Sequence, residues 1–245
     1  MVMADNQNID DAPRRRVPSW LRETAILVVV ALVLSVLLQT FVGRVYYIPS
    51  GSMEPTLLVG DRIAADKMTF RFGDPQPGDV VVFRAPTSSW NIGYRSTRSD
   101  NPIVKALQDA GSWAGLVAPD ENDLVKRVIA TGGQTVQCCD AQGRVEVDGR
   151  PLDEPYVVRD FPFVDNQLTC QTAPPSGRCF GPVEVPDGSL WVMGDNRSGS
   201  ADSRAHAGDE LGGTVPVDDV IGKARLIVLP PSRWGVIDSP SIQQR

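Results

Sequence analysis

The residues best placed to carry out chemistry begin with a serine-rich turn braced by prolines. It reads Pro49-Ser50-Gly51-Ser52-Met53-Glu54-Pro55. Such a turn can hold one hydroxyl, that of Ser52, rigidly exposed. A neutral hydroxyl is a weak nucleophile, so Ser52 needs a base within reach.

Two types of base are open to Ser52. Histidine is the habitual one, and His206 is the single histidine of the chain, so any Ser-His-Asp arrangement has to use it. The alternative is a lysine that burial keeps neutral, because removal from water lowers a lysine pKa from about 10.4 by several units. Lys126 has a fitting context, since on a strand it shares one face with Leu124 and Val128. A lysine among apolar residues usually extends its amine to solvent, so this pattern alone does not decide between the two bases.

A third polar segment runs from Gly194 to Arg204 and follows a hydrophobic stretch. It combines turn-forming residues, hydroxyls and charges of both signs in one loop. The same composition is typical of an ordinary solvent-exposed turn. As part of a site, Ser200 is expected to accept a hydrogen bond from Lys126. Asp202 and Arg204 are expected to pair and fix the loop.

The element that must position this chemistry is an uncharged apolar run at residues 24–43. Its length matches the roughly 20 residues that a membrane-spanning helix needs. A cleaved signal peptide is the rival interpretation, but the run is longer than a typical signal core and no small-x-small site follows it. Four arginines precede it and only Arg44 lies close behind it, so we expect residues 1–23 in the cytoplasm and the rest outside. Ser52 would then lie within roughly 35 Å of the membrane.

The chain beyond residue 43 is predicted to be mainly β. Short runs rich in β-branched residues, bounded by Gly, Pro or Asp, occur at 79–83, 124–130, 144–147, 189–193 and 222–229. We assign 44–134 and 191–232 to a core, 135–190 to a smaller accessory lobe, and 233–245 to a loosely ordered tail. Apolar residues recur at helical spacing over 103–117, ending near Trp113. This helix either covers the sheet or rests on lipid, and the sequence favours neither.

Composition narrows the partners and the cysteine chemistry. The net charge of −6 and the scarcity of basic clusters beyond the apolar run argue against nucleic acid. Four cysteines, in the part predicted to lie outside, favour disulfides: Cys138, Cys139, Cys170 and Cys179. A disulfide between Cys170 and Cys179 would close a loop. The adjacent Cys138 and Cys139 are expected to form a disulfide with each other only with difficulty. Three full pairings remain open, and the spacing predicts no metal site.

In order and spacing, these segments resemble the type I signal peptidases, membrane-anchored Ser/Lys proteases that release exported proteins. Residues 48–57 resemble the nucleophile box, 78–83 the strand box after it, 126–129 the lysine box and 194–204 the C-terminal box. The resemblance implies a β-rich catalytic core with an inserted cap lobe and no cofactor. Residues 130–134 differ from the turn that is usual in this family, because this chain lacks the acidic residue found there.

The resemblance also implies a role for each matching residue. Ser52 is the nucleophile, Lys126 the general base, and the Ser52 N–H with the Ser50 hydroxyl the oxyanion hole. The supporting residues are Ser200, Asp202, Arg204 and Asp195. Ile48, Met53 and Val125 are expected to shape shallow pockets for small substrate residues (Ala-x-Ala).

The implied partners are secretory preproteins, the lipid bilayer and the export machinery, at a bacterial plasma membrane. Two rival functions are a self-cleaving Ser/Lys repressor, which should carry a DNA-binding domain, and an inert membrane-tethered binding module. A penicillin-interacting enzyme is disfavoured, because no serine is followed by a lysine three positions later.

Overall fold

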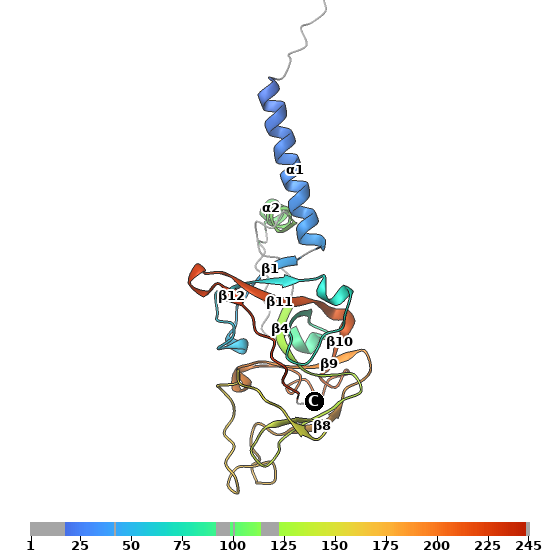
Figure 1. Ribbon diagram of the computed structural model, residues 1–245, viewed down its shortest axis with the longest axis vertical. Coiled ribbons are helices and arrows are strands. Elements are labelled where there is room, and N and C mark those ends of the chain that lie inside the picture. Colours follow the sequence, from blue (N-terminus) through green and yellow to red (C-terminus); the bar gives the residue numbers. More distant parts are fainter. Residues whose placement is uncertain (1–17, 42, 92–98, 100, 114–122, 244–245) are drawn as a thin grey trace, which may run out of the picture.

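The computed structural model describes residues 18–41, 43–91, 99, 101–113 and 123–243. Helix α1 (Ser19–Phe41) stands away from a body made of strands (Figure 1). It covers most of the predicted anchor, but it begins earlier, and Gly43 already belongs to strand β1. Among the residues described, we find no helix whose length and apolar character suffice to cross a membrane. The membrane-spanning part of the prediction therefore remains unconfirmed.

Eight strands form the larger sheet, which confirms the prediction of a mainly β fold. Its order is β1-β2-β11-β3-β4-β9-β10, β12 also pairs with β11, and every pairing is antiparallel. The bounds are β1 Gly43–Tyr47, β2 Arg62–Asp66, β3 Val80–Arg84, β4 Asp123–Thr131, β9 Ser189–Met193, β10 Val215–Pro216, β11 Val220–Leu229 and β12 Gly235–Val236. Strand β4, which carries Lys126, lies between β3 and β9 and is therefore held on both edges.

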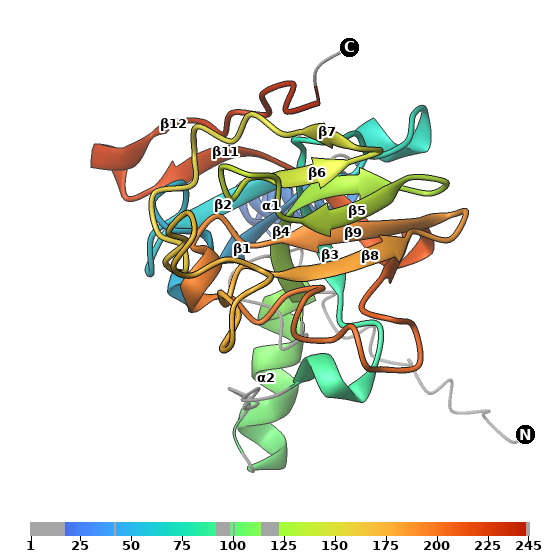
Figure 2. The same cartoon turned by 90° about the horizontal axis from the view of Figure 1, so that it is seen from below.

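A smaller four-stranded sheet, ordered β7-β6-β5-β8, lies within the predicted accessory lobe. Its bounds are β5 Thr135–Cys138, β6 Val145–Val147, β7 Arg150–Pro151 and β8 Phe180–Glu184. Figure 2 shows β5, β6 and β8 beside β4 and β9 of the larger sheet. One core cluster joins the two sheets, and in it Phe180 stacks on the buried Trp191 with ring centroids 5.5 Å apart. Ser189 and Leu190 pair within the larger sheet, so the lobe's own strands end at Glu184.

The tail is packed, contrary to the expectation of a loose end. After β12, Ile237 and Ile242 are buried, the latter completely. The Gln243 amide donates to the Ile129 carbonyl of β4 at 3.1 Å. Pro240 lies so close to Gly78 that a Cβ there would meet its carbonyl oxygen at 2.0 Å. The sequence did not indicate this packing, because Ile237 and Ile242 are separated by Asp-Ser-Pro-Ser and form no periodic apolar pattern.

The cysteines also correct an expectation. Adjacent Cys138 and Cys139 form a disulfide with each other, across a cis peptide bond, and Cys170 bonds to Cys179. The loop-closing bridge is thus present, and the adjacent pair, which was expected to bond only with difficulty, is joined as well, with its two Cα atoms 3.0 Å apart.

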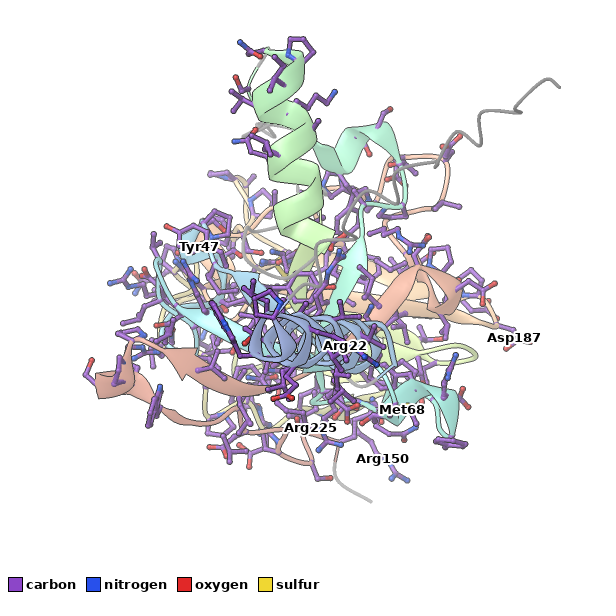
Figure 3. All side chains as sticks on the ribbon, turned by 90° about the horizontal axis from the view of Figure 1, so that it is seen from above. Arg22, Tyr47, Met68, Arg150, Asp187 and Arg225 are labelled. Atoms are coloured by element: carbon purple, nitrogen blue, oxygen red, sulfur yellow. A yellow bond between two sulfur atoms is a disulfide. The ribbon has the colours of Figure 1, made fainter. Side chains whose placement is uncertain are left out.

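Helix α2 (Pro102–Trp113) occupies part of the predicted 103–117 helix, and residues 114–117 lie outside the described residues. Ile103 is 72% exposed and Leu107 is 68% exposed. Figure 3, which looks down α1, shows α2 extending away from the body. Over the residues that the structure describes, this helix therefore does not cover the sheet.

Candidate active site

The predicted nucleophile lies in a short 3-10 turn, η1 (Gly51–Met53), between β1 and β2. The Met53 side chain anchors this turn, because it is buried in a hydrophobic core cluster. Asn196 fixes it from the side: its backbone N–H donates to the Ser52 carbonyl at 3.1 Å, and its side-chain amide donates to the Gly51 carbonyl at 3.0 Å. The Ser50 hydroxyl lies on the exposed side, with its Oγ 3.5 Å from that of Ser52. The turn is thus held by backbone bonds while its hydroxyls stay accessible.

Lys126 reaches Ser52 from the middle of β4. Its Nζ lies 2.9 Å from Ser52 Oγ and donates to the Val125 carbonyl at 3.1 Å. Only 4% of the residue is exposed. Burial lowers the pKa of Lys126 to about 8, although the carboxylates of Asp202 and Asp195 oppose that shift. The structure thus brings a hydroxyl together with an amine that is easily made neutral.

Asp202 and Arg204 pair as expected. The Arg204 Nε and Nη2 donate to the two Asp202 carboxylate oxygens at 2.9 and 2.8 Å, and Nη2 also donates to the Arg197 carbonyl at 2.7 Å. The Asp202 carboxylate further accepts from the Gly194 N–H at 3.0 Å. Burial would raise the Asp202 pKa, but the hydrogen bonds and charge of Arg204 hold it below its usual value. This pair ties both ends of the C-terminal loop together.

Ser200 departs from the expected geometry. Its Oγ is buried, and among the described residues no hydrogen bond joins it to the Lys126 amine. The hydroxyl lies against Gly194 instead, where a Cβ would meet it at 2.3 Å. Its place beside the loop and the nucleophile turn is as expected, whereas its role as a partner of the amine stays a prediction.

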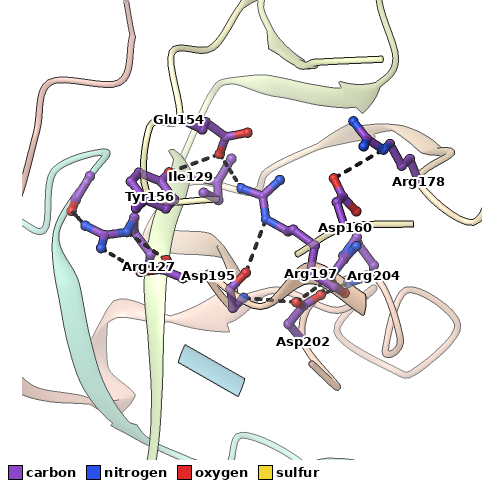
Figure 4. Close-up of polar contacts among 12 residues, drawn as sticks. Arg127, Ile129, Glu154, Tyr156, Asp160, Arg178, Asp195, Arg197, Asp202 and Arg204 are labelled. Carbon is purple, nitrogen blue, oxygen red and sulfur yellow. Dashed lines mark hydrogen bonds and ion pairs between the residues drawn. The ribbon is translucent and has the colours of Figure 1, made fainter. Parts of the chain in front are cut away.

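Asp195 does not touch the lysine either; it forms a buried ion pair with Arg127 (Figure 4). Arg127 Nε and Nη2 donate to its two oxygens at 2.9 and 2.8 Å, which is the bidentate geometry of strong Arg–carboxylate pairs. Thr56 donates to the same carboxylate at 2.5 Å. Asp195 thereby connects the nucleophile turn, the lysine strand and the C-terminal loop.

A second buried pair links the smaller lobe to the site. Arg197 pairs with Glu154, and the Tyr156 hydroxyl donates to the same Glu154 oxygen at 3.0 Å (Figure 4). The Tyr156 ring packs under the Arg127 guanidinium, 3.9 Å from its centre. Burial and the charge of Glu154 raise the Tyr156 pKa well above its usual range, so this hydroxyl stays neutral.

His206 lies near the site without contacting the nucleophile. Its ring stacks on Trp90 with centroids 4.2 Å apart and planes 20° from parallel. Burial lowers its pKa, against the opposing charges of Asp209 and Asp202. Within the described chain, the imidazole makes no hydrogen bond to Ser52, so the geometry favours Lys126 as the base.

The residues expected to shape the substrate pocket lie around the nucleophile turn. Ile48 and Met53 are almost completely buried in one core cluster, and Val125 is a partly buried residue packed against it. Val125 therefore offers surface to a substrate, whereas the other two define the floor beneath it. Their role in specificity stays a prediction.

Sequence reasoning missed two supporting residues, Arg127 and Asn196. A partial signal for Arg127 was present, because it lies within an apolar run, and an arginine that is buried there needs a carboxylate partner. Asn196 lies inside the polar loop already singled out, but its contacts depend on the tertiary approach of that loop to the turn.

Comparison with known proteins gives independent evidence for the family of this chain. Residues 21–229 match the family described as signal peptidase, peptidase S26. The chain is 57% identical over 244 residues to a signal peptidase I of Mycobacterium tuberculosis, covering 96% of this chain and 81% of that protein. It is 53% identical over 249 residues to a probable signal peptidase I of Mycobacterium leprae, covering 95% and 83%. A probable signal peptidase I-1 of Synechocystis is 36% identical over 220 residues, covering 90% and 88%. The chain therefore belongs to the signal peptidase family, peptidase S26.

Proposed function

We propose that this protein is a membrane-anchored serine endopeptidase that removes signal peptides from secretory preproteins, with Ser52 as nucleophile and neutral Lys126 as general base. One observation carries the assignment of the two residues: the Lys126 Nζ lies 2.9 Å from the Ser52 Oγ inside a buried environment. Family membership supports the substrate class. The uncharged run at 24–43 supports an anchor in a bacterial plasma membrane, with the N-terminus cytoplasmic and the catalytic body outside.

The first half of the reaction forms an acyl-enzyme. With its amine neutral, Lys126 accepts the Ser52 proton while Oγ attacks the scissile carbonyl carbon. The resulting oxyanion receives hydrogen bonds from the Ser52 N–H and the Ser50 hydroxyl, and one such donor contributes about 3 kcal/mol to other acyl-transfer enzymes. Lys126 then gives the proton to the leaving amine, which departs as the new N-terminus of the mature protein.

The second half releases the signal peptide. Lys126, neutral again, takes a proton from a water molecule, which attacks the acyl carbon. Lys126 then returns this proton to the Ser52 oxygen, which leaves as a hydroxyl. Asp202 with Arg204, and Asp195 with Arg127, hold the loop and the strand on which this exchange depends. The apolar surface around Val125 favours small side chains near the scissile bond, because a larger one is excluded sterically.

Processing of a purified preprotein by the full chain in detergent or lipid tests the proposal directly. Intact protein should shorten the preprotein at one site preceded by small residues, and Ser52→Ala should leave it uncut. Cleavage by the Ser52→Ala variant at the same site would refute the assigned nucleophile.

A further inference from the structure

Helix α2 presents an apolar face that the described part of the protein does not cover. Its start is well defined, because the Asn101 side chain accepts from the backbone N–H groups of Ile103 and Val104 at 3.0 and 3.4 Å. At 100° per residue, Ile103 and Leu107 share one face while Lys105 lies on the opposite one. Ile103 and Leu107 are each about two-thirds exposed or more. Burying a side chain of this kind contributes about 1.5–3 kcal/mol, so adjacent exposed ones indicate a missing partner.

The orientation of α2 indicates which partner this is. Figure 1 shows α2 nearly end-on at the level of the body-proximal half of α1, whereas Figure 3, which looks along α1, shows α2 lying lengthwise. The two helices are therefore crossed at a steep angle, and Figure 2 shows the same from the other side. If α1 spans a bilayer, α2 lies roughly in the plane of that bilayer, on the side where the catalytic body hangs.

We propose that α2 is an interfacial helix that binds the lipid surface through Ile103 and Leu107, with Lys105 directed to water. Helices with one apolar and one polar face bury the apolar one at the boundary between headgroups and acyl chains. This inference rests on the membrane anchor of the proposed function. It gives the catalytic body a second point of attachment.

The second attachment has a consequence for catalysis. A body held by α1 alone can rotate about that helix, whereas two crossed elements fix which edge of the sheet faces the bilayer. Strand β4, with Lys126, begins at Asp123, ten positions after the end of α2 at Trp113. Contact of α2 with lipid thus orients the lysine strand relative to a substrate whose own signal segment lies in the bilayer.

Site-specific photocrosslinking in phosphatidylcholine nanodiscs tests the contact on the full chain. A benzophenone amino acid replaces Ile103 or Leu107, with Lys105 as the opposite-face control and Val28 of α1 as the anchor control. We expect phospholipid adducts at 103 and 107 in about tenfold higher yield than at 105. The first two positions would lie in the apolar phase, whereas position 105 would face water. Equal yields at 103, 105 and 107, or adducts to a second protein copy at 103 and 107, would overturn the inference.

The Val28 control separates this failure from failure of the anchor. Lipid adducts at 28 but not at 103 and 107 would leave the anchor standing and reject the interfacial helix. Absence of lipid adducts at 28 would reject the anchor, and the interfacial helix with it.

A double substitution, Ile103→Asp with Leu107→Asp, gives an activity readout. Processing of a preprotein in the nanodisc should fall about tenfold, because charged side chains oppose insertion at the interface. Cleavage of a short soluble peptide spanning the processing site should stay unchanged. Lys105→Asp, which adds an acid to the polar face, should alter neither rate. Equal loss on both substrates, or loss on neither, would contradict the proposal.

Discussion

Lys126 and Arg127 are neighbours on β4, yet burial lowers the pKa of the Lys126 amine to about 8, whereas Arg127 carries a permanent charge. The Arg127 guanidinium donates to both Asp195 oxygens and to the Gly78 and Asp238 carbonyls. Lys126, on the opposite face, donates to the Val125 carbonyl and Ser52 Oγ and to no other group of the residues that the structure describes. These four hydrogen bonds of Arg127 fix the strand, while the sparser surroundings of Lys126 leave its charge poorly stabilised.

The choice of base is tested by three single substitutions. Lys126→Ala and Ser52→Ala should each abolish preprotein cleavage, since one removes the proton acceptor and the other the attacking oxygen. His206→Ala should keep most of the activity, because its ring stacks on Trp90 and not on the nucleophile. Initial rates on one preprotein measure all three. Loss with His206→Ala and retention with Lys126→Ala would reverse the assignment.

The pH dependence of kcat/KM reports the lysine directly. Only the neutral amine accepts the Ser52 proton, so the rate should rise with pH along a limb centred near pH 8, the pKa that burial gives Lys126. Rates on a soluble peptide between pH 5 and 10 measure the limb. A limb centred near pH 6.5, the ordinary range of a histidine, would contradict this base.

Residue types and local order singled out Ser52, Lys126 and the loop at 194–204, because a hydroxyl needs a base and a strand face places one amine among apolar side chains. They did not decide between Lys126 and His206 as the base, and the resemblance to the type I signal peptidases supplied that choice. The structure brings these residues together across a sheet that local spacing does not describe. Arg127 and Asn196 escaped because their partners approach only after folding. Ser200 was assigned a bond to Lys126 that the tertiary packing does not form.

The remaining differences have one physical origin. Disulfide pairing and tail packing depend on contacts between distant segments. Local sequence does not reveal that Ile242 fits beside Ile129 in a core cluster shared by both sheets. Nor does it reveal that the Cys138–Cys139 peptide is cis, which is rare outside X-Pro bonds. The five predicted strands agree with β3, β4, β6, β9 and β11, because alternation and β-branching act within a few residues, whereas the other strands were not predicted.

Burying the lysine should carry a cost in stability. Below pH 8 the amine is charged in both folded and unfolded chains, and the folded chain holds that charge out of water. Between pH 8 and 10.5 the unfolded chain binds the extra proton, so stability from this group rises with pH. Lys126→Met should therefore raise the free energy of unfolding by about 3 kcal/mol at pH 6, because the pKa falls from 10.5 to about 8 and one pKa unit corresponds to about 1.4 kcal/mol.

Urea denaturation at pH 6 and pH 10.5 measures this effect. The increase in the free energy of unfolding caused by Lys126→Met should be smaller at pH 10.5. At that pH the Lys126 amine of the parent is neutral in the folded chain and partly neutral in the unfolded one. A variant that is less stable than the parent at pH 6 would show that the charged amine is well satisfied.

Asp195→Asn tests the buried pair with Arg127. Loss of the carboxylate leaves a buried guanidinium without its counter-charge, which typically costs about 3–5 kcal/mol. Arg144→Gln is the control, because its pair with Asp140 is half exposed and such pairs contribute about 0–1 kcal/mol. Denaturant unfolding measures both. Since Asp195 raises the Lys126 pKa, the same substitution should move the limb of the pH–rate profile to lower pH.

The packed tail is tested by Ile242→Ala. Ile242 is completely buried and its carbonyl accepts from the Asp153 N–H at 3.0 Å, so removing its side chain leaves a cavity between the tail and the two sheets. Such truncations cost about 2–5 kcal/mol. Ser241→Ala, one residue earlier and exposed, should change stability by less than about 0.5 kcal/mol. Thermal unfolding of the full chain in one detergent measures both, and equal melting temperatures would mean that the tail does not support β4. Ile242→Val, which keeps most of the buried volume, should restore most of the stability, because the cost depends on the volume left empty and not on the length of the tail.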